Sequence, residues 1–219
     1  MRRVFITRKI DSIAVETLSE NFEVYMRPEN SPLPIAQLVD AVSNYDAILS
    51  TVTEKFNKEI LDKSSTLKVI SNYAAGLDNI NVEYANNLGI TVYNIPDSVI
   101  NSTADLTFAI LLSLIRNINQ ANKFVRNGSW KSWDPEIFLG EELNGKVFGI
   151  LGMGKIGKAV ARRAIGFGLK IIYHNRTEKG ELTLIDEEIR YVSLEKLLSD
   201  SDYISVHVPL NKETNRLID

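Results

Sequence analysis

The chain has 219 residues, of which 44% are apolar and 24% charged, and its formal net charge is −3. This balance is typical of a globular protein and gives no basic footprint for nucleic acid. The chain has no cysteine, which excludes disulfides and cysteine metal sites, and no apolar run reaches the roughly eighteen residues of a membrane helix. We therefore expect a cytoplasmic enzyme or binding protein without a metal, membrane or nucleic-acid partner.

Strand-like and helix-like segments alternate from the first residues onward. Short β-branched runs predict strands, and apolar residues at helical spacing predict helices. The predicted strands are 4–7, 22–26, 47–49, 67–70 and 90–93, and the clearest helices are 12–19 and 35–42. Such alternation favours a parallel sheet covered by helices on both faces.

The pattern changes after Ile95-Pro96, where a stretch without proline or glycine begins. We predict one long, mostly buried helix over 101–126, capped by Ser102 or Thr103. Its sequence is apolar nearly all the way round, and such a helix must be covered on most sides. A homodimer interface is one way to cover it, and burial between two domains of the same chain is the other.

A second alternation follows this helix. Predicted strands are 146–151, 170–174, 190–193 and 203–206, with helices at 155–167 and 194–198. The sequence therefore predicts an α/β protein with two doubly wound parallel sheets.

The first strand of the second alternation ends in GILGMGKIG, which places Gly152, Gly154 and Gly157 in G-x-G-x-x-G spacing. In a dinucleotide site, the first glycine permits a tight turn, the second lets a pyrophosphate approach the backbone, and the third lets the helix pack on the strand. Glycines also end strands without binding anything, so the pattern alone is weak. Its place between a strand and an amphipathic helix favours the dinucleotide interpretation.

The next strand ends in His174, Asn175, Arg176 and Thr177. An NAD site normally has Asp or Glu here, which accepts from the ribose 2′-hydroxyl. An arginine, with Asn175 and Thr177 as neutral donors, suits the 2′-phosphate of NADP instead. The alternative is an ordinary solvated surface arginine. We predict NADP as the preferred cofactor, with NAD as the second possibility.

Several motifs together resemble the D-isomer-specific 2-hydroxyacid dehydrogenase family. They are NYAAGLDNI at 72–80, YNIPDSVINSTADLTFAILL at 93–112, the glycine turn, and HVPLNKETNRLI at 207–218. Within the family, VFITRKI, FLGEELNGK and N-R-T are most similar to the archaeal glyoxylate and hydroxypyruvate reductases. The resemblance implies an oxidoreductase that transfers hydride from NAD(P)H to a small 2-keto acid and gives the 2-hydroxy acid.

The resemblance also implies roles for the domains. Residues 1–98 would form a flavodoxin-like substrate domain, 99–126 a helix between domains that also forms the dimer, and 127–219 the first half of a Rossmann domain. The substrate carboxylate would bind backbone amides of Ala75, Gly76 and Leu77, as glycine-containing turns suit anions. The expected cofactor-binding residues are Gly152, Met153, Gly154, Lys155, Ile156, Gly157, Asn175, Arg176, Thr177, Val208 and Pro209.

No catalytic residue is expected within the chain. The family's Arg, Glu and His lie in motifs that do not occur here and would follow Asp219, so we expect a truncated chain that is inactive alone. A phosphoglycerate dehydrogenase-like enzyme is the nearest alternative, although the lack of an acid at the 2′ position counts against it. A nucleotide-sensing corepressor, or a remnant that only binds nucleotide or dimerises, also remains open.

Overall fold

The computed structural model of the chain describes residues 1–178, 182–184 and 187–218. It divides into two compact units. The first unit comprises Met1–Val99 with Pro209–Asp219, and the second comprises Ile100–Val208. This division differs from the sequence-based one, which placed 209–219 with the nucleotide domain and set 99–126 apart. No helix in the described part of the chain is long and apolar enough to cross a membrane.

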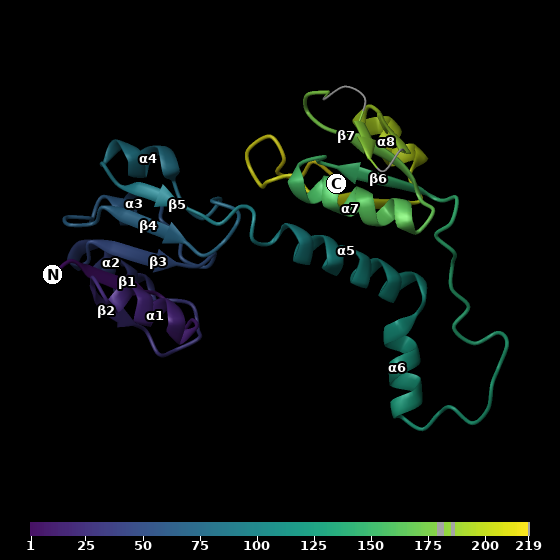
Figure 1. Ribbon diagram of the computed structural model, residues 1–219, viewed down its shortest axis with the longest axis horizontal. Helices are drawn as coiled ribbons and strands as arrows, with labels where there is room; N and C mark the ends of the chain where they lie inside the picture. The colour runs from purple at the N-terminus through teal and green to yellow at the C-terminus, as the bar shows by residue number, and fades with distance from the viewer. Residues whose placement is uncertain (179–181, 185–186, 219) are drawn as a thin grey trace. The chain divides into compact units, whose positions relative to one another are not determined.

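The first unit is a five-stranded parallel sheet with the strand order β2-β1-β3-β4-β5 (Figure 1). This is the flavodoxin-like order predicted for the substrate domain. Its strands are β1 Arg3–Ile6, β2 Glu23–Met26, β3 Ala47–Ser50, β4 Val69–Asn72 and β5 Thr91–Tyr93, and its helices are α1 Ser12–Ser19, α2 Ile35–Asn44, α3 Lys58–Leu61 and α4 Val82–Asn87.

Alternation along the strands builds the core of the first unit. Phe5, Ile48 and Ile70 are paired across β1, β3 and β4 and are buried in one apolar cluster. Helix α2 supplies Leu38, Ala41 and Val42 to the same cluster, a spacing that keeps them on one helical face. Because all five strands run in parallel, the loops that follow β1, β3 and β4 meet at one edge of the sheet.

The second unit has the strand order β10-β6-β7-β9-β8. The first four strands are parallel and repeat the 3-2-1-4 order with which a dinucleotide-binding sheet begins. The elements are α5 Ile100–Ile115, α6 Ile118–Arg126, β6 Val147–Leu151, α7 Lys155–Gly166, β7 Lys170–His174, β8 Leu182–Leu184, β9 Glu187–Tyr191, α8 Leu194–Asp200 and β10 Tyr203–Val206.

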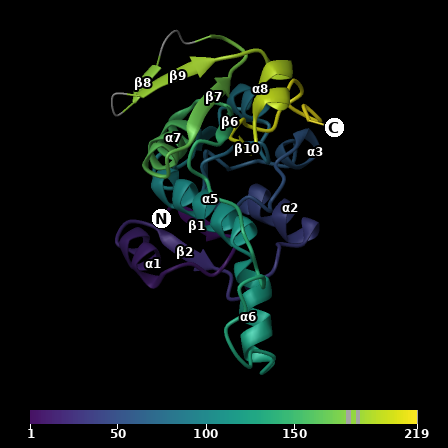
Figure 2. The same ribbon diagram turned by 90° about the vertical axis from the view of Figure 1, so that its right-hand side faces the viewer.

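The edge of this second sheet was not predicted. Strand β8 pairs antiparallel to β9, whereas the sequence predicted only parallel strands and a single strand at 190–193. Figure 2 shows β8 and β9 side by side, next to β7. A three-residue strand is too short to carry a readable period, which explains why β8 was missed.

The prediction of one helix over 101–126 was wrong. Helix α5 ends at Ile115, Asn117 adopts a left-handed conformation with φ 52°, and α6 turns away from the axis of α5 (Figure 1). The returning chain holds this break, because Glu141 N–H donates to the Ile115 carbonyl at 3.1 Å and the Asn117 side chain donates to the Leu139 carbonyl. Asparagine tolerates the left-handed region better than most residues, so the break needs neither glycine nor proline.

Helix α5 is also less buried than expected. Ala104, Phe108, Leu111 and Ile115 pack into the core of the second unit. Phe108 stacks on Phe167 with the ring centroids 5.0 Å apart, and the Arg163 guanidinium of α7 pairs with Asp105 at 2.6 Å. A second apolar face is exposed within the unit, at Leu106 (59%), Ile110 (61%) and Leu114 (69%).

Candidate functional site

The turn between β6 and α7 depends on two of its glycines for steric reasons. Gly152 has φ +101°, and a Cβ on it would lie 2.8 Å from the His207 carbonyl group. A Cβ on Gly157 would lie 2.3 Å from the Gly152 carbonyl oxygen. Gly152 therefore admits the chain that follows β10, and Gly157 lets the first turn of α7 sit against the strand end.

Gly154 differs from both, because a Cβ on it would meet no described atom within 4 Å. It is the N-cap of α7 and has ordinary extended backbone angles. No side chain caps the helix, and the amides of a helix's first turn have no acceptor within the helix itself. The result is an open space at a positive helix end, which suits the phosphates of a dinucleotide.

The turn is connected to the end of β7 through Asn175. The Met153 N–H donates to the Asn175 side-chain oxygen at 2.7 Å, so that amide is engaged within the protein. This argues against the predicted pyrophosphate contact at Met153 and leaves the later amides of the turn for that role. The Asn175 side-chain nitrogen is buried and has no partner among the described residues.

Strand β9 fixes the backbone at the end of β7. His174 Nδ1 lies 2.9 Å from the Val192 carbonyl, and its ring stacks on Tyr191 at 5.7 Å. The Tyr191 hydroxyl donates to the Asn175 carbonyl at 3.3 Å. Arg176 and Thr177 follow this fixed point and are exposed. The first acid after them is Glu178, also exposed.

The segment after β10 lies against the glycine turn. The His207 N–H donates to the Leu151 carbonyl at 2.8 Å, and Val208 contacts the position where a Cβ on Gly152 would be. Burial lowers the pKa of His207, and its Nε2 lies 2.7 Å from the Ser205 hydroxyl. A neutral, engaged imidazole is a poor proton donor near neutrality. Pro209 falls in the first unit.

In the first unit, three successive carbonyl groups of the loop after β4 accept hydrogen bonds. The Ala74 carbonyl accepts from Ile95 N–H at 3.0 Å. The Ala75 carbonyl accepts from the Asn94 side chain at 2.7 Å, and the Gly76 carbonyl accepts from the Asn72 side chain at 3.0 Å.

These bonds orient the neighbouring amides. In a planar trans peptide the carbonyl of one residue and the N–H of the next point in opposite directions. The N–H groups of Ala75, Gly76 and Leu77 therefore point away from the donors that hold the carbonyls, and none of them donates to a described residue. Successive amides without acceptors of this kind can bind an anion, as they do in other turns.

Sequence reasoning identified the loop but missed the side chains that set it. Asn72 and Asn94 each stand at the carboxyl end of a predicted strand. Polar residues at that edge of a parallel sheet are candidates for supporting a site, and this signal could have found them.

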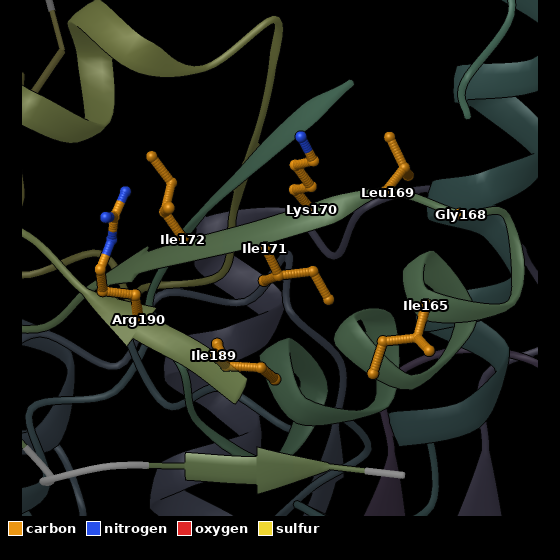
Figure 3. Close-up of a pocket in the computed structure, with 8 residues that line it drawn as sticks. All are labelled: Ile165, Gly168, Leu169, Lys170, Ile171, Ile172, Ile189 and Arg190. Carbon is orange, nitrogen blue, oxygen red and sulfur yellow. The ribbon is translucent and has the colours of Figure 1, made fainter. Parts of the chain in front are cut away.

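A large cavity lies elsewhere in the second unit. It is lined by the N-terminal half of β7, the end of α7 and two residues of β9, with Lys170 and Arg190 beside isoleucines (Figure 3). In the parallel pairing of β6 and β7, Lys170 is opposite Val147, whereas the glycine turn follows Leu151. The cavity is therefore at the opposite end of these strands from the turn, and it is not part of the candidate site.

Within the described residues no cluster of His, Asp and Glu could hold a metal.

Comparison with known proteins agrees with this geometry. Residues 108–219 match the family model described as D-isomer specific 2-hydroxyacid dehydrogenase, NAD binding domain. The chain is 45% identical to the glyoxylate reductase of Thermococcus litoralis, over 99% of its own length and 66% of that protein's. It spans 65–66% of the length of the first three curated relatives, slightly under two thirds.

Solved structures give the same picture. A protein of Thermus thermophilus matches with a TM-score of 0.90 and 39% identity, covering 98% of this chain and 67% of that one. A glyoxylate reductase from Paecilomyes thermophila matches with a TM-score of 0.83 and 32% identity, covering 99% and 68%.

Proposed function

The chain belongs to the D-isomer specific 2-hydroxyacid dehydrogenase family, and we propose that the protein is an NADPH-dependent reductase of small 2-keto acids such as glyoxylate or hydroxypyruvate. The family's NAD-binding domain covers residues 108–219. The observation that carries the proposal is the open space at Gly154, at the uncapped start of α7. The names of the related glyoxylate reductases support the choice of substrate class.

The residues of the second unit fit a dinucleotide. Gly154 leaves room for the pyrophosphate, and the first-turn amides of α7 would bind it. Arg176 is exposed at the end of β7, where a guanidinium can form charge-assisted hydrogen bonds with a 2′-phosphate. Thr177 would add a neutral donor beside it. These features support NADP over NAD.

The first unit would bind the substrate's carboxylate. The amides of Ala75, Gly76 and Leu77 donate to no described acceptor, and an anion is the ligand that such amides favour. Once bound, the nicotinamide supplies the hydride for reduction. The chain's own contribution is to bind the cofactor and the substrate and to place donor groups opposite their negative charges.

We expect neither histidine of the chain to donate the proton that reduction requires. His174 is engaged with Val192 and stacked on Tyr191, and burial lowers the pKa of His207. The family resemblance assigns the proton donor, its acidic partner and a carboxylate-binding arginine to motifs absent from residues 1–219. We expect the residues of this chain to bind and orient the cofactor and the substrate, which contributes to the rate by fixing the reactive geometry.

The exposed apolar face of α5 suits a second copy of the chain. Leu106, Ile110 and Leu114 repeat at helical spacing on a face left uncovered within the second unit. Apolar surface of this kind is stabilised by removal from water. We therefore propose a homodimer that uses this face.

The test is the rate of NADPH consumption by the intact gene product with glyoxylate, hydroxypyruvate and 3-phosphohydroxypyruvate in turn. We expect consumption with one or both of the first two. A preference for the phosphorylated acid would instead support the phosphoglycerate dehydrogenase-like alternative. NADPH binding without consumption of any of the three would support a nucleotide-sensing role and overturn the proposal.

A further inference from the structure

A connected network of buried polar side chains lies beneath the loop at 74–77. Asn72 is 1% exposed, and its side-chain nitrogen donates both to the Gly76 carbonyl and to Asn79 at 3.1 Å. Its oxygen accepts from the Ser50 hydroxyl at 3.1 Å. Asn79 in turn donates to the Thr51 carbonyl at 3.1 Å. The loop is thus bonded to the segment after β3 by side-chain amides.

Glu54 anchors the far end of this network. Its carboxylate is 2% exposed and accepts from the hydroxyls of Thr7, Thr51 and Thr53 and from the Thr51 N–H, at 2.7–3.0 Å. The Glu54 carbonyl also accepts from Asn79 at 2.9 Å. A buried carboxylate with four donors resists rearrangement, because each lost bond would leave a buried charge less satisfied.

The peptide between Ala75 and Gly76 depends most on a hydrogen bond that holds its orientation. Rotation of the peptide between Ala75 and Gly76 would turn its carbonyl to where its N–H now points. The φ angle of Gly76 lies outside the left-handed region, and the rotation would carry it towards positive values, which glycine adopts at little cost. In the present conformation the Asn94 side chain holds this carbonyl at 2.7 Å.

We propose that Asn94, with Asn72, is a positioning residue that keeps the loop at 74–77 in its anion-binding form. This inference rests on the proposed function, since it concerns the loop assigned to the substrate carboxylate. Without the Asn94 donor, the Ala75 carbonyl can rotate and present an acceptor to the anion. One favourable amide contact is then replaced by a repulsive one, whereas the dinucleotide turn in the second unit is untouched.

The test compares steady-state kinetics of the intact gene product with those of its Asn94→Ala variant. We expect the KM for glyoxylate to rise at least about tenfold, the effect of losing one hydrogen bond to a charged group, while the dissociation constant of NADPH stays unchanged. Asn87→Ala, at an exposed asparagine that ends α4, is the matched control and should leave both constants unchanged.

A double variant separates peptide rotation from general damage. Alanine disfavours positive φ, so adding Gly76→Ala to Asn94→Ala should penalise the rotated peptide and restore most of the affinity for glyoxylate. The close neighbour of the new Cβ is the movable Asp78 carboxylate, at 2.9 Å. If Asn94→Ala weakened glyoxylate binding only through lost packing, adding Gly76→Ala would not restore the affinity.

The outcomes are distinguishable. An inactive wild-type protein overturns the proposed function. An active wild-type protein whose Asn94→Ala variant keeps its KM, or whose double variant shows no recovery, overturns the inference and leaves the proposed function intact. If Asn94→Ala does not fold, Asn94→Ser keeps a polar group at this half-buried position but is shorter, and the same prediction applies to it.

Discussion

Each residue of the glycine turn can be assigned a separate physical task. Gly152 supplies a positive φ and admits the chain after β10, and Gly157 removes a clash with the Gly152 carbonyl. Gly154 does neither, since a Cβ on it would meet no described atom within 4 Å. The spacing predicted the tight turn at Gly152 and the close packing at Gly157, because both depend on backbone geometry that the motif itself fixes.

Replacement of Gly154 should therefore remove cofactor binding without unfolding the chain. A Gly154→Val side chain has room within the protein and would occupy the space proposed for the phosphates. We expect NADPH binding to be lost while the far-ultraviolet circular dichroism stays at the wild-type level. Gly157→Val is the contrasting variant, because its Cβ meets backbone at 2.3 Å and should lower thermal stability. A collapsed spectrum for Gly154→Val would show that this glycine is structural.

Arg176 should determine the choice between the two cofactors. Charge-assisted hydrogen bonds to a 2′-phosphate are each worth about 1.5–3 kcal/mol. Arg176→Ala should therefore weaken NADPH binding by about 10- to 100-fold and leave NADH binding nearly unchanged. Cofactor fluorescence titrations measure both constants. Equal weakening of the two, or of neither, would contradict the 2′-phosphate assignment.

Glu54 makes the stability of the first unit depend on pH. Burial raises the pKa of Glu54, but hydrogen bonds from Thr53, Thr51 and Thr7 together lower it by more, to below its ordinary value of 4.5. The carboxylate therefore stabilises the folded state above about pH 4.5, and this stabilisation is lost as the pH falls through the folded-state pKa.

The variant Glu54→Gln tests that dependence. At pH 7 it should lower the free energy of unfolding by about 1–3 kcal/mol, because at least one buried donor loses its acceptor. The difference from wild type should shrink as the pH falls below 4.5. Urea unfolding across that range measures it, and a difference that stays constant with pH would show that the carboxylate's charge is not involved.

Much of the candidate site could be predicted from the sequence, but the supporting side chains could not. The glycine turn and the loop at 75–77 carry local backbone signals. The bond from Met153 to Asn175 joins residues 22 positions apart, and that from Asn94 to Ala75 spans 19. Such pairs depend on side-chain positions in loops that meet only in the folded sheet, and no local pattern in the sequence reveals them.

Strand and helix positions were predicted most accurately where packing and local period agree. α1, β7 and β10 match the predicted bounds. The long helix was predicted wrongly because propensity alone favours continuation through Asn117. The break comes from tertiary hydrogen bonds to the returning segment at 139–141, which no local pattern contains.

A substitution on the exposed face of α5 tests whether this face forms the proposed dimer. Ile110→Glu places a charge at the centre of that face, and burial of an unpaired charge is costly. We expect sedimentation equilibrium to show a dimer for the wild-type protein at micromolar concentration and at least about tenfold weaker association for the variant. Ile35→Glu, at a 74% exposed position that starts α2, should have no effect. A monomeric wild-type protein would contradict the proposed interface.

The two units of the chain follow the same architectural rule. Each parallel sheet presents its candidate ligand-binding groups beyond the carboxyl ends of its strands: the amide loop after β4 in the first unit and the glycine turn after β6 in the second. In both, backbone amides are the groups proposed to bind a negative charge. The alternating sequence predicted two such sheets, since βα repetition leaves few other ways to bury apolar strands.

We infer that these two features serve one NADPH-dependent reduction. This inference is tested most directly by kcat/KM for NADPH and for NADH, measured with glyoxylate on the intact gene product. We predict turnover with both cofactors or with NADPH alone, and a kcat/KM at least about tenfold higher for NADPH, the effect of one charge-assisted hydrogen bond. A higher value for NADH, or no turnover with either cofactor, would contradict the claim.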